Sequence, residues 1–280
     1  MKPKIRIVDK SFSHTPNSSF ACGAFDMPPT HFEWHRGEQI SDLVVVTESG
    51  ISELNTLKEK NKVLLIIEPE SICPQIYIDI RNPTLYNQFK FVLTHDSSLV
   101  KDLPNARLYF FGGCWIKPED QKVYEKSKNV SIIASAKRQT IGHNLRHFAI
   151  ERFSNKIEGV YGRGYKVLEN KIEGLKDFRY HIAIENQRSD YWVTEKLIDC
   201  FATGAVPIYY GTTGVKSIFD ERGMLFFNTL EELEQCLVKA TPEYYEQCRP
   251  YIEENFKRCK YGMIPEDALW NSFFSPEFFS

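Results

Sequence analysis

The first half of the chain repeats short hydrophobic runs of strand length, and the longer stretches between them include a helical pattern at Ile51 to Lys60. Strands that alternate with helices are typical of a parallel sheet with crossover connections. The sequence therefore predicts an α/β domain in this half. The expected strands are Ile5 to Val8, Leu43 to Thr47, Val63 to Ile67, Phe91 to Thr94 and Leu108 to Phe111.

A second alternation of strands and helices follows a break in this pattern. Two glycines, Gly112 and Gly113, and a polar segment at 117–129 indicate a domain boundary. We expect domains at 1–120 and 130–265, and an aromatic tail at 266–280 that packs back on the body. In the second domain the expected strands are 130–134, 180–184, 206–210 and 224–227, with a strand or turn at 157–161. The expected helices are 142–153, 194–203 and two acidic helices that begin at 229 and 242.

Composition and charge exclude several classes of protein. The chain has 280 residues, 42% of them hydrophobic, which suits a folded protein with a substantial core. Its net charge of −2 gives no basic footprint for nucleic acid, so we expect no nucleic-acid partner. The longest apolar run, Val63 to Ile67, is far shorter than the roughly 18 residues of a membrane span. Seven cysteines without metal-binding spacing predict reduced thiols in a cytosol-like compartment; they stand at 22, 73, 114, 200, 236, 248 and 259.

The segment 180–211 carries the most informative pattern. A buried strand, Tyr180 to Ile184, is followed by a helix that Thr194 can cap and Gly204 can end, and then by a strand at 206–210. In such a βαβ unit the end of the first strand and the start of the helix meet at one edge of the sheet, where open α/β sheets bind ligands. This edge carries Glu185, Asn186, Thr194, Glu195 and Lys196.

The charges at this edge indicate an anionic ligand. Lys196 stands in the first turn of the expected helix, where the helix dipole disfavours a cation. A bound diphosphate explains such a cation, and Glu195 in the same turn suits hydrogen bonds from sugar hydroxyls. A purely structural alternative stays open from the spacing alone, in which Thr194 and Glu195 cap the helix and Lys196 is solvated.

In this segment the chain resembles the family 10 glycosyltransferases, the α-1,3/1,4-fucosyltransferases that use GDP-fucose. The resemblance rests on IEN, YWVTEKLID and GAVPIYYG, with a step of nine residues from Asn186 to Glu195 and with Lys196 directly after. It extends more loosely over 131–227, through SIIASAKRQTIGHNLRHFAIERF and VYGRGYKV. It implies a GT-B fold, with two facing Rossmann-like domains and mainly parallel sheets, and an inverting transfer of fucose to a hydroxyl of a glycan acceptor.

The resemblance also implies a donor site in the second domain. Glu195 is expected at hydroxyls of the sugar or ribose, and Lys196 at the diphosphate. Arg146 matches a helix arginine that neutralises the phosphates, although Arg152 on the same helix is an equally basic competitor. Two positions depart from the family pattern: Ile184 replaces a phenylalanine, and Trp192 stands at an aromatic position before Thr-Glu-Lys. The expected donor-binding residues are Arg146, Glu185, Asn186, Trp192, Thr194, Glu195 and Lys196.

A second candidate site follows the strand expected at Val63 to Ile67. Glu68 and Glu70 stand at or just after the end of this strand, a position that active-site residues take in parallel sheets. The family has a glutamate at the matching place, where it is the general base that deprotonates the acceptor hydroxyl. The resemblance therefore implies this role for Glu68 or Glu70, with Glu68 the better fit to the strand end. The alternative is that both are solvated loop carboxylates.

No metal site or cofactor is expected. The histidines lack paired ligand spacing, and the sequence has no DxD motif. Family members of animal origin carry a membrane stem and disulfides, and their absence here predicts a soluble microbial or viral form in the cytoplasm of a microbial cell or a virus-infected host cell. Two alternatives stay open: a GT-B transferase that uses a different nucleotide sugar, and a catalytically silent protein that binds nucleotide sugars or glycans.

Overall fold

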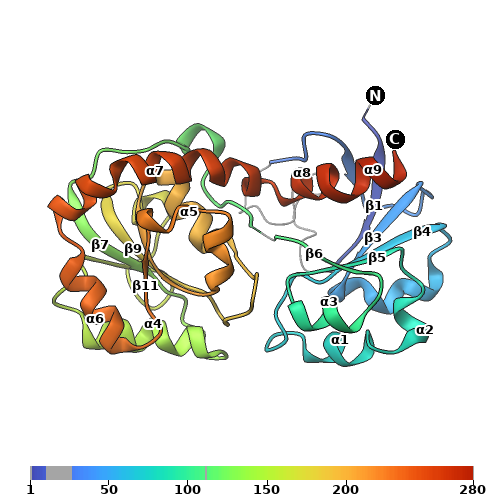
Figure 1. Ribbon diagram of the computed structural model, residues 1–280, viewed down its shortest axis with the longest axis horizontal. Helices are drawn as coiled ribbons and strands as arrows, with labels where there is room; N and C mark the ends of the chain where they lie inside the picture. The colour runs from blue at the N-terminus through green and yellow to red at the C-terminus, as the bar shows by residue number, and fades with distance from the viewer. Residues whose placement is uncertain (1, 11–26, 111, 280) are drawn as a thin grey trace. The chain divides into compact units, whose positions relative to one another are not determined.

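The structure is a computed structural model that describes residues 2–10, 27–110 and 112–279, so Cys22 lies outside the described residues. The chain forms two compact units, each with its own sheet (Figure 1). The units are not continuous in sequence, because unit 1 takes a short segment from the middle of the chain and another from its end. Unit 1 comprises Met1–Gly113, Ser189–Trp192 and Ile264–Ser280, and unit 2 comprises Cys114–Arg188 and Val193–Met263.

Unit 1 is built on a six-stranded, fully parallel sheet in the order β2-β1-β3-β4-β5-β6. Its central strands β3 and β4 are runs of valine and leucine, as expected where helices cover both faces of a parallel sheet. The strands are β1 (Lys4–Val8), β2 (Glu33–His35), β3 (Leu43–Thr47), β4 (Asn61–Leu65), β5 (Phe91–Thr94) and β6 (Ala106–Leu108).

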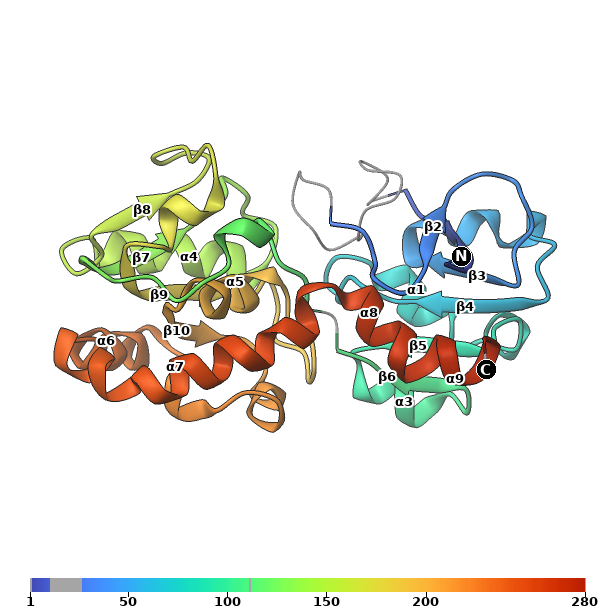
Figure 2. The same cartoon turned by 90° about the horizontal axis from the view of Figure 1, so that it is seen from above.

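Helices cover both faces of this sheet. On one face Val46 and Leu64 pack against Tyr77 of α1, and on the other face Val45 and Leu65 pack in one cluster with the aromatic C-terminal segment. Figure 2 shows this segment running alongside β5. The helices of unit 1 are α1 (Pro74–Asp79), α2 (Pro83–Tyr86), α3 (Ser97–Asp102), α8 (Pro265–Leu269), a π-helical turn (Trp270–Phe274) and α9 (Ser275–Phe278).

Several details of unit 1 differ from the sequence prediction. The prediction does not include strand β2, and the strand predicted at Leu108 to Phe111 is instead β6, Ala106–Leu108, with residue 111 outside the described residues. The helix predicted at Ile51 to Lys60 is instead a 3-10 helix, Glu48–Thr56. Leu54 is buried within this helix, and the extended backbone at the C-cap, Leu57, ends it. Strand β4 begins and ends two residues earlier than predicted, because its ladder with β5 stops at Leu65.

Unit 2 is built on a five-stranded parallel sheet in the order β11-β10-β9-β7-β8. Its strands are β7 (Lys128–Ile133), β8 (Gly159–Tyr161), β9 (Phe178–Ile184), β10 (Val206–Tyr210) and β11 (Leu225–Phe226). Its α-helices are α4 (Ile141–Arg152), α5 (Glu195–Thr203), α6 (Leu230–Lys239) and α7 (Pro242–Met263), with 3-10 helices at Pro118–Asp120, Lys171–Gly174, Thr213–Ser217 and Glu221–Gly223.

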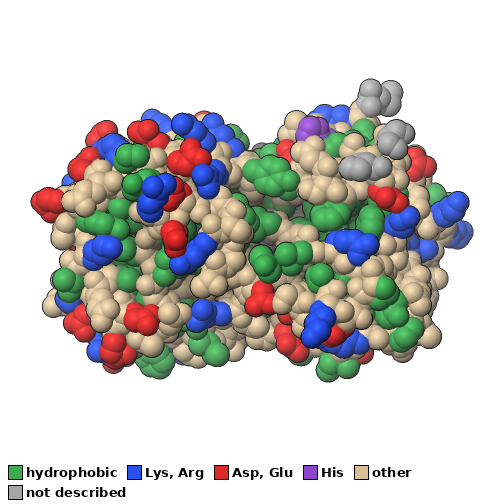
Figure 3. All heavy atoms as spheres, in the orientation of Figure 1, with side chains coloured by type: hydrophobic (Ala, Val, Ile, Leu, Met, Phe, Trp, Pro, Cys, Tyr) green, Lys and Arg blue, Asp and Glu red, His purple; other side chains and the backbone are tan. Residues whose placement is uncertain are grey.

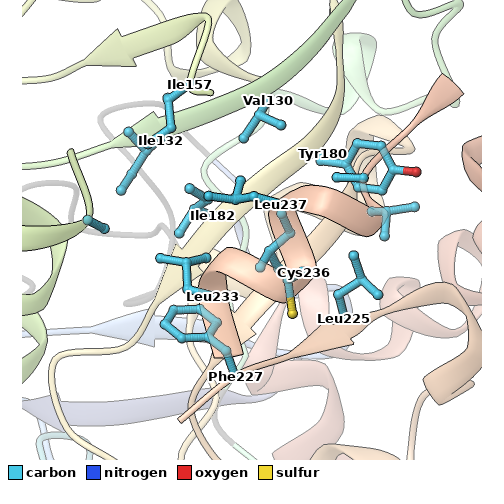
Figure 4. Close-up of a cluster of buried hydrophobic side chains, with 14 of the residues drawn as sticks. Val130, Ile132, Ile157, Tyr180, Ile182, Leu225, Phe227, Leu233, Cys236 and Leu237 are labelled. Carbon is cyan, nitrogen blue, oxygen red and sulfur yellow. The ribbon is translucent and has the colours of Figure 1, made fainter. Parts of the chain in front are cut away.

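The core of unit 2 explains how its sheet positions the helices. Alternate residues of β9, Tyr180, Ile182 and Ile184, point to one face and pack with Leu233 and Leu237 of α6, as Figure 4 shows for several of them. The residues between them face the other side, where α5 packs against β9, β10 and α7. Helix α5 is predicted correctly, down to the left-handed glycine, Gly204, that ends it with φ of 73°.

Charges of both signs are distributed over the surface. Figure 3 shows Lys and Arg side chains interspersed with Asp and Glu on the face in view. Within residues 2–10, 27–110 and 112–279, every helix is too short or too polar to cross a bilayer. The six cysteines that the structure describes are free thiols.

Candidate functional site

Unit 2 contains a pocket of about 530 Å³ at the carboxyl ends of β7 and β9. In the sheet, β8 lies on one side of β7 and β9 on the other, so the order of the strands reverses at this point. Open α/β sheets bind ligands at such a reversal, because the loops that follow the two strands diverge to opposite faces. Five cationic side chains and one carboxylate, Glu195, line the pocket, so an anionic ligand suits it. The cationic residues are Lys137, Arg146, Arg163, Lys171 and Lys196.

A buried carboxylate holds the start of helix α5 at the edge of this pocket. Glu185 accepts hydrogen bonds from the backbone N–H of Thr194 at 3.0 Å and from the Thr194 hydroxyl at 2.8 Å. The Thr194 oxygen in turn accepts from the backbone N–H of Lys196, so the predicted N-cap is present. Burial raises the pKa of Glu185, which the ammonium of Lys196 opposes. Glu185 therefore fixes the first turn of the helix that carries Glu195 and Lys196.

Lys196 is paired with carboxylates. Its Nζ lies 3.1 Å from Oε1 of Glu195 and 3.6 Å from Oε2 of Glu185. The sequence predicts that a bound anion accounts for a cation in this first turn. The structure shows that the two carboxylates already balance it, so its position alone is not evidence for a diphosphate. Its place in the lining of the pocket is the stronger observation.

Glu195 is held in its ionised form by two lysines. Besides Lys196, Nζ of Lys171 lies 3.6 Å from Oε1 of Glu195 and 2.6 Å from Oδ2 of Asp199. Burial disfavours a charge on Glu195, but the two ammonium groups outweigh that cost and lower the pKa of Glu195 to about 2. An ionised carboxylate accepts hydrogen bonds and donates none, so Glu195 suits hydroxyl groups of a ligand.

Arg146 joins helix α4 to the end of β9. Its Nε donates to the carbonyl oxygen of Ile184 at 3.2 Å, and its Nη2 donates to the same oxygen and to Oδ1 of Asn186 at 2.9 Å. Among the described residues, Nη1 has no acceptor, so it can donate to a ligand in the pocket. Burial lowers the pKa of Arg146, and Glu185 opposes this shift. Arg152, the competitor on the same helix, pairs instead with Glu231 at 2.8 Å and is absent from the lining.

A glycine allows helix α4 to approach β9 closely. A Cβ atom on Gly142 would lie 1.8 Å from the carbonyl oxygen of Glu185, a distance that no side chain tolerates. The backbone N–H of Gly142 also donates to the carbonyl oxygen of Asn186 at 3.0 Å. The close approach brings Arg146, one turn further along, within reach of Ile184 and Asn186.

Two histidines of the pocket are neutral near pH 7. Burial lowers the pKa of His181 to about 3, and its Nδ1 lies 2.8 Å from the hydroxyl oxygen of Ser131. Burial, together with Arg146, lowers the pKa of His143 to about 4. The positive charge of the pocket therefore comes from its lysines and arginines.

The predicted donor-binding residues divide into two groups. Arg146, Asn186, Glu195 and Lys196 line the pocket together. Glu185 and Thr194 do not line it: Glu185 is 0% exposed and Thr194 is 3% exposed, with their oxygens bonded to each other. Both residues lie buried beneath the lining and hold the start of helix α5, so their predicted contact with the donor stays a prediction. Trp192 is also absent from the lining and belongs to unit 1, so its donor contact stays a prediction.

Sequence reasoning missed several residues of the pocket. Lys137 follows β7 and Arg163 follows β8. Both stand in segments that resemble the family, but neither cation is among the expected donor-binding residues. Lys171 begins a short 3-10 helix, and its Nζ lies 4.8 Å from the ring centroid of Trp115, which is 45% exposed at the pocket. Lys137 and Arg163 could have been predicted from the sequence, because each cation stands just after a strand of a parallel sheet. No local sequence pattern predicts that Lys171 and Trp115 line the pocket.

Glu68 and Glu70 lie in unit 1, beyond the end of β4. Glu68 is half-buried and Glu70 is exposed in the turn that leads to α1. The carbonyl oxygen of Glu68 accepts a hydrogen bond from the hydroxyl of Tyr77 at 2.9 Å. A base role for either glutamate stays a prediction, and the firmer attachment of Glu68 favours it over Glu70. Across the described residues, no group of three or more His, Cys, Asp or Glu side chains is arranged to hold a metal ion.

Comparison with known proteins connects the pocket to a family. Residues 123–241 match the family described as glycosyltransferase family 10 (fucosyltransferase), C-terminal domain. The α-(1,3)-fucosyltransferase FucT of Helicobacter pylori is 29% identical over 90 residues, which are 30% of this chain and 19% of that protein. The chain thus covers about a fifth of the length of this relative.

Solved structures share the fold of the chain. A crystal structure of an α1,3-fucosyltransferase covers 95% of this chain and 90% of its own, with a TM-score of 0.57 and 15% identity. A second, of an α1,3-fucosyltransferase with GDP, covers 95% and 92%, with a TM-score of 0.54 and 14% identity. The matched segment contains all five parallel strands of the unit 2 sheet together with Arg146, Asn186, Glu195 and Lys196. Unit 2 of the chain is thus similar to the C-terminal domain of glycosyltransferase family 10, and the two parallel-sheet units together have the GT-B fold.

Proposed function

We propose that the protein is a fucosyltransferase that binds GDP-fucose in the pocket of unit 2 and transfers fucose, with inversion, to a hydroxyl of a glycan acceptor. The observation that carries this proposal is that Arg146, Asn186, Glu195 and Lys196, which stand in the segment that matches the family, line one pocket. A solved structure with a similar fold holds GDP, which supports the choice of nucleotide.

The charges of the pocket suit a nucleoside diphosphate. Nη1 of Arg146 and the ammonium of Lys196 can donate to phosphate oxygens, and charge-assisted hydrogen bonds of this kind are among the strongest in proteins. Glu195, ionised and fixed by two lysines, can accept from the hydroxyls of ribose or fucose. The exposed Trp115 ring beside Lys171 offers an apolar surface for a nucleobase.

The proposed reaction is a single displacement. The acceptor oxygen forms a bond to the anomeric carbon of fucose, the bond from that carbon to the β-phosphate oxygen breaks, and GDP leaves. The acceptor hydroxyl gives its proton to a general base in unit 1, for which we propose Glu68, with Glu70 as the alternative. Arg146 and Lys196 stabilise the negative charge that develops on the leaving diphosphate.

The proposed mechanism includes no metal ion and no cofactor. Many enzymes that cleave diphosphates use a bound cation to neutralise the leaving group. Here the lining of the pocket brings five cationic side chains to the same task. A diphosphate neutralised in this way is a good leaving group, so no general acid is needed.

Nucleotide release tests the proposal. The protein is incubated with GDP-fucose and an array of glycan acceptors, and GDP is measured; parallel reactions contain other nucleotide sugars. We expect release that requires both GDP-fucose and an acceptor, and a product whose anomeric configuration is opposite to that of the donor. Turnover with another nucleotide sugar alone would contradict the choice of fucose. Binding of GDP-fucose without turnover on any acceptor would instead favour a silent binding protein.

A further inference from the structure

The backbone just beyond β4 is held by side chains rather than by the sheet. The last backbone hydrogen bond from this strand to β5 is made by Ile66, whose N–H donates to the carbonyl oxygen of Leu93 at 2.9 Å. Ile67 and Glu68 lie past that point, yet Ile67 is 1% exposed and Glu68 is half-buried. Backbone polar groups that are shielded from water need other partners, because leaving them unpaired is costly.

The N–H and carbonyl groups of Ile67 and Glu68 each have a side-chain partner, and the buried His95 ring also hydrogen-bonds this backbone. Both oxygens of the Glu48 carboxylate accept, one from the N–H of Ile67 and one from the N–H of Glu68, each at 3.0 Å. The indole Nε1 of Trp192 donates to the carbonyl oxygen of Ile67 at 3.0 Å. The hydroxyl of Tyr77 donates to the carbonyl oxygen of Glu68 at 2.9 Å. We call Glu48, Tyr77 and Trp192 the base cradle.

The members of the base cradle come from three separate segments of unit 1. Glu48 directly follows β3, Tyr77 lies in α1, and Trp192 belongs to the segment Ser189–Trp192. Exposure of the three residues is 8%, 2% and 3%, respectively. Burying a carboxylate is expensive, and here burial raises the pKa of Glu48 to about 7. If this position only had to be filled, an apolar side chain would fill it without the desolvation cost of a buried carboxylate.

We propose that Glu48, Tyr77 and Trp192 are positioning residues that fix the backbone of Glu68 and so aim its carboxylate at the acceptor hydroxyl. This inference rests on the proposed function of Glu68 as the general base. A base acts over a hydrogen bond of about 3 Å, so a small displacement of its backbone costs rate. The cradle fixes both peptide groups that flank the Cα atom of Ile67 and the carbonyl oxygen of Glu68 itself, so the backbone from which the base projects is held in place.

The inference predicts a loss of kcat without a loss of donor binding. The variants are Glu48→Gln, whose amide replaces one accepting oxygen by a donor, Tyr77→Phe and Trp192→Phe, which each remove one donor and keep a ring. We expect each to lower kcat at least about tenfold, while KM for GDP-fucose and Kd for GDP change less than about twofold in Glu48→Gln and Tyr77→Phe. Because Trp192 also has a predicted contact with the donor, its variant is compared by kcat alone. The matched control is Tyr245→Phe, since the buried Tyr245 hydroxyl donates to the carbonyl oxygen of Gly204 at 2.8 Å outside the pocket. It should lose stability and keep kcat.

A double-variant cycle separates positioning from a general structural role. In the background of Glu68→Gln the cradle has no base to aim, so adding Tyr77→Phe should lower kcat no further. A structural role would add its full cost in both backgrounds. Thermal melting and GDP binding of each variant show whether it folds; where Glu48→Gln does not fold, the other two variants decide.

The possible results distinguish the inference from the function on which it rests. If Glu68→Gln loses at least about 100-fold in kcat but all folded cradle variants turn over like the wild type, the inference is wrong and the base stands. Additive losses in the cycle also overturn it. If Glu68→Gln keeps full turnover, the base assignment is wrong and the cradle has no catalytic role. Absence of turnover by the wild type with every acceptor overturns the proposed function as a whole.

Discussion

Nη2 of Arg146 donates to Oδ1 of Asn186 at 2.9 Å and also bonds the carbonyl oxygen of Ile184, so one guanidinium fastens helix α4 to the end of β9. Arg146 and Asn186 stand 40 positions apart in the chain, and both line the pocket of unit 2. The pair shows that the arginine is oriented before any ligand binds. A pre-oriented donor loses little conformational entropy on binding, which favours affinity.

Replacing this arginine should weaken nucleotide binding more than charge alone explains. We expect Arg146→Ala to raise Kd for GDP by roughly 10- to 100-fold, the value of one or two charge-assisted contacts. Arg146→Lys keeps the charge but loses the fork that holds Asn186, so it should recover only part of the affinity. Calorimetry with GDP measures both. Arg152→Ala is the matched control on the same helix, and an equal loss there would contradict the assignment.

Lys196 should contribute to donor binding although carboxylates already pair with it. We expect Lys196→Ala to weaken GDP binding by at least about 1.5 kcal/mol, because a phosphate contact in a partly buried site is charge-assisted. Lys216→Ala serves for comparison, since Lys216 pairs with Glu221 at 2.5 Å and lies outside the lining of the pocket. Unchanged GDP affinity of Lys196→Ala would mean that this lysine serves only to hold Glu195 and Glu185.

The two candidate bases should separate by kinetics. If Glu68 is the base, Glu68→Gln loses at least about 100-fold in kcat while GDP binding stays near the wild-type value, because the base acts on the acceptor and not on the donor. Glu70→Gln should then be mild, as expected for an exposed turn residue. The reverse result assigns the role to Glu70. Near-full turnover of both variants places the base elsewhere.

Buried His181 should make the protein less stable as the pH falls. Its pKa is about 3 in the folded state and about 6.5 when exposed, so below pH 6.5 the unfolded chain binds a proton that the folded chain excludes. The free energy of unfolding therefore decreases as the pH falls from about 6.5 towards 3, by at most about 1.4 kcal/mol per pH unit for this group.

Urea unfolding at several pH values checks this expectation. The shifted pKa values of His95 and His143, both about 4, add to the same trend, so the wild type alone does not identify His181. His181→Asn should show a shallower pH dependence than the wild type. An equal slope in His181→Asn and in the wild type would refute the assignment.

Activity should persist in excess EDTA. The lysines and arginines of the pocket supply the positive charge that the leaving diphosphate requires, and the proposed mechanism takes no step through a metal ion. GDP release is measured with and without the chelator. Loss of activity in EDTA with recovery on adding Mn²⁺ would contradict the metal-independent mechanism.

The sequence by itself determined the elements around the pocket and the residues that share its edge. Strand β9, the Thr194 cap, helix α5 and Gly204 follow from hydrophobic period and capping chemistry, which act over a few residues. The same local rules bring Asn186, Glu195 and Lys196 to one side of a βαβ unit. Strand–helix alternation likewise predicts two parallel-sheet units before any contact is known.

Only the tertiary structure decided which polar side chains face the pocket and which are buried beneath it. Glu185 and Glu195 are alike in sequence terms, yet packing of α5 on the sheet closes Glu185 to solvent and leaves Glu195 in the lining. Lys171 reaches Glu195 from another part of the chain, and Glu48 reaches the backbone of Glu68 from the 3-10 helix that follows β3. Period and capping describe one element at a time, whereas a buried charge is fixed by partners that the fold brings from a distance, because desolvation must be offset at that place.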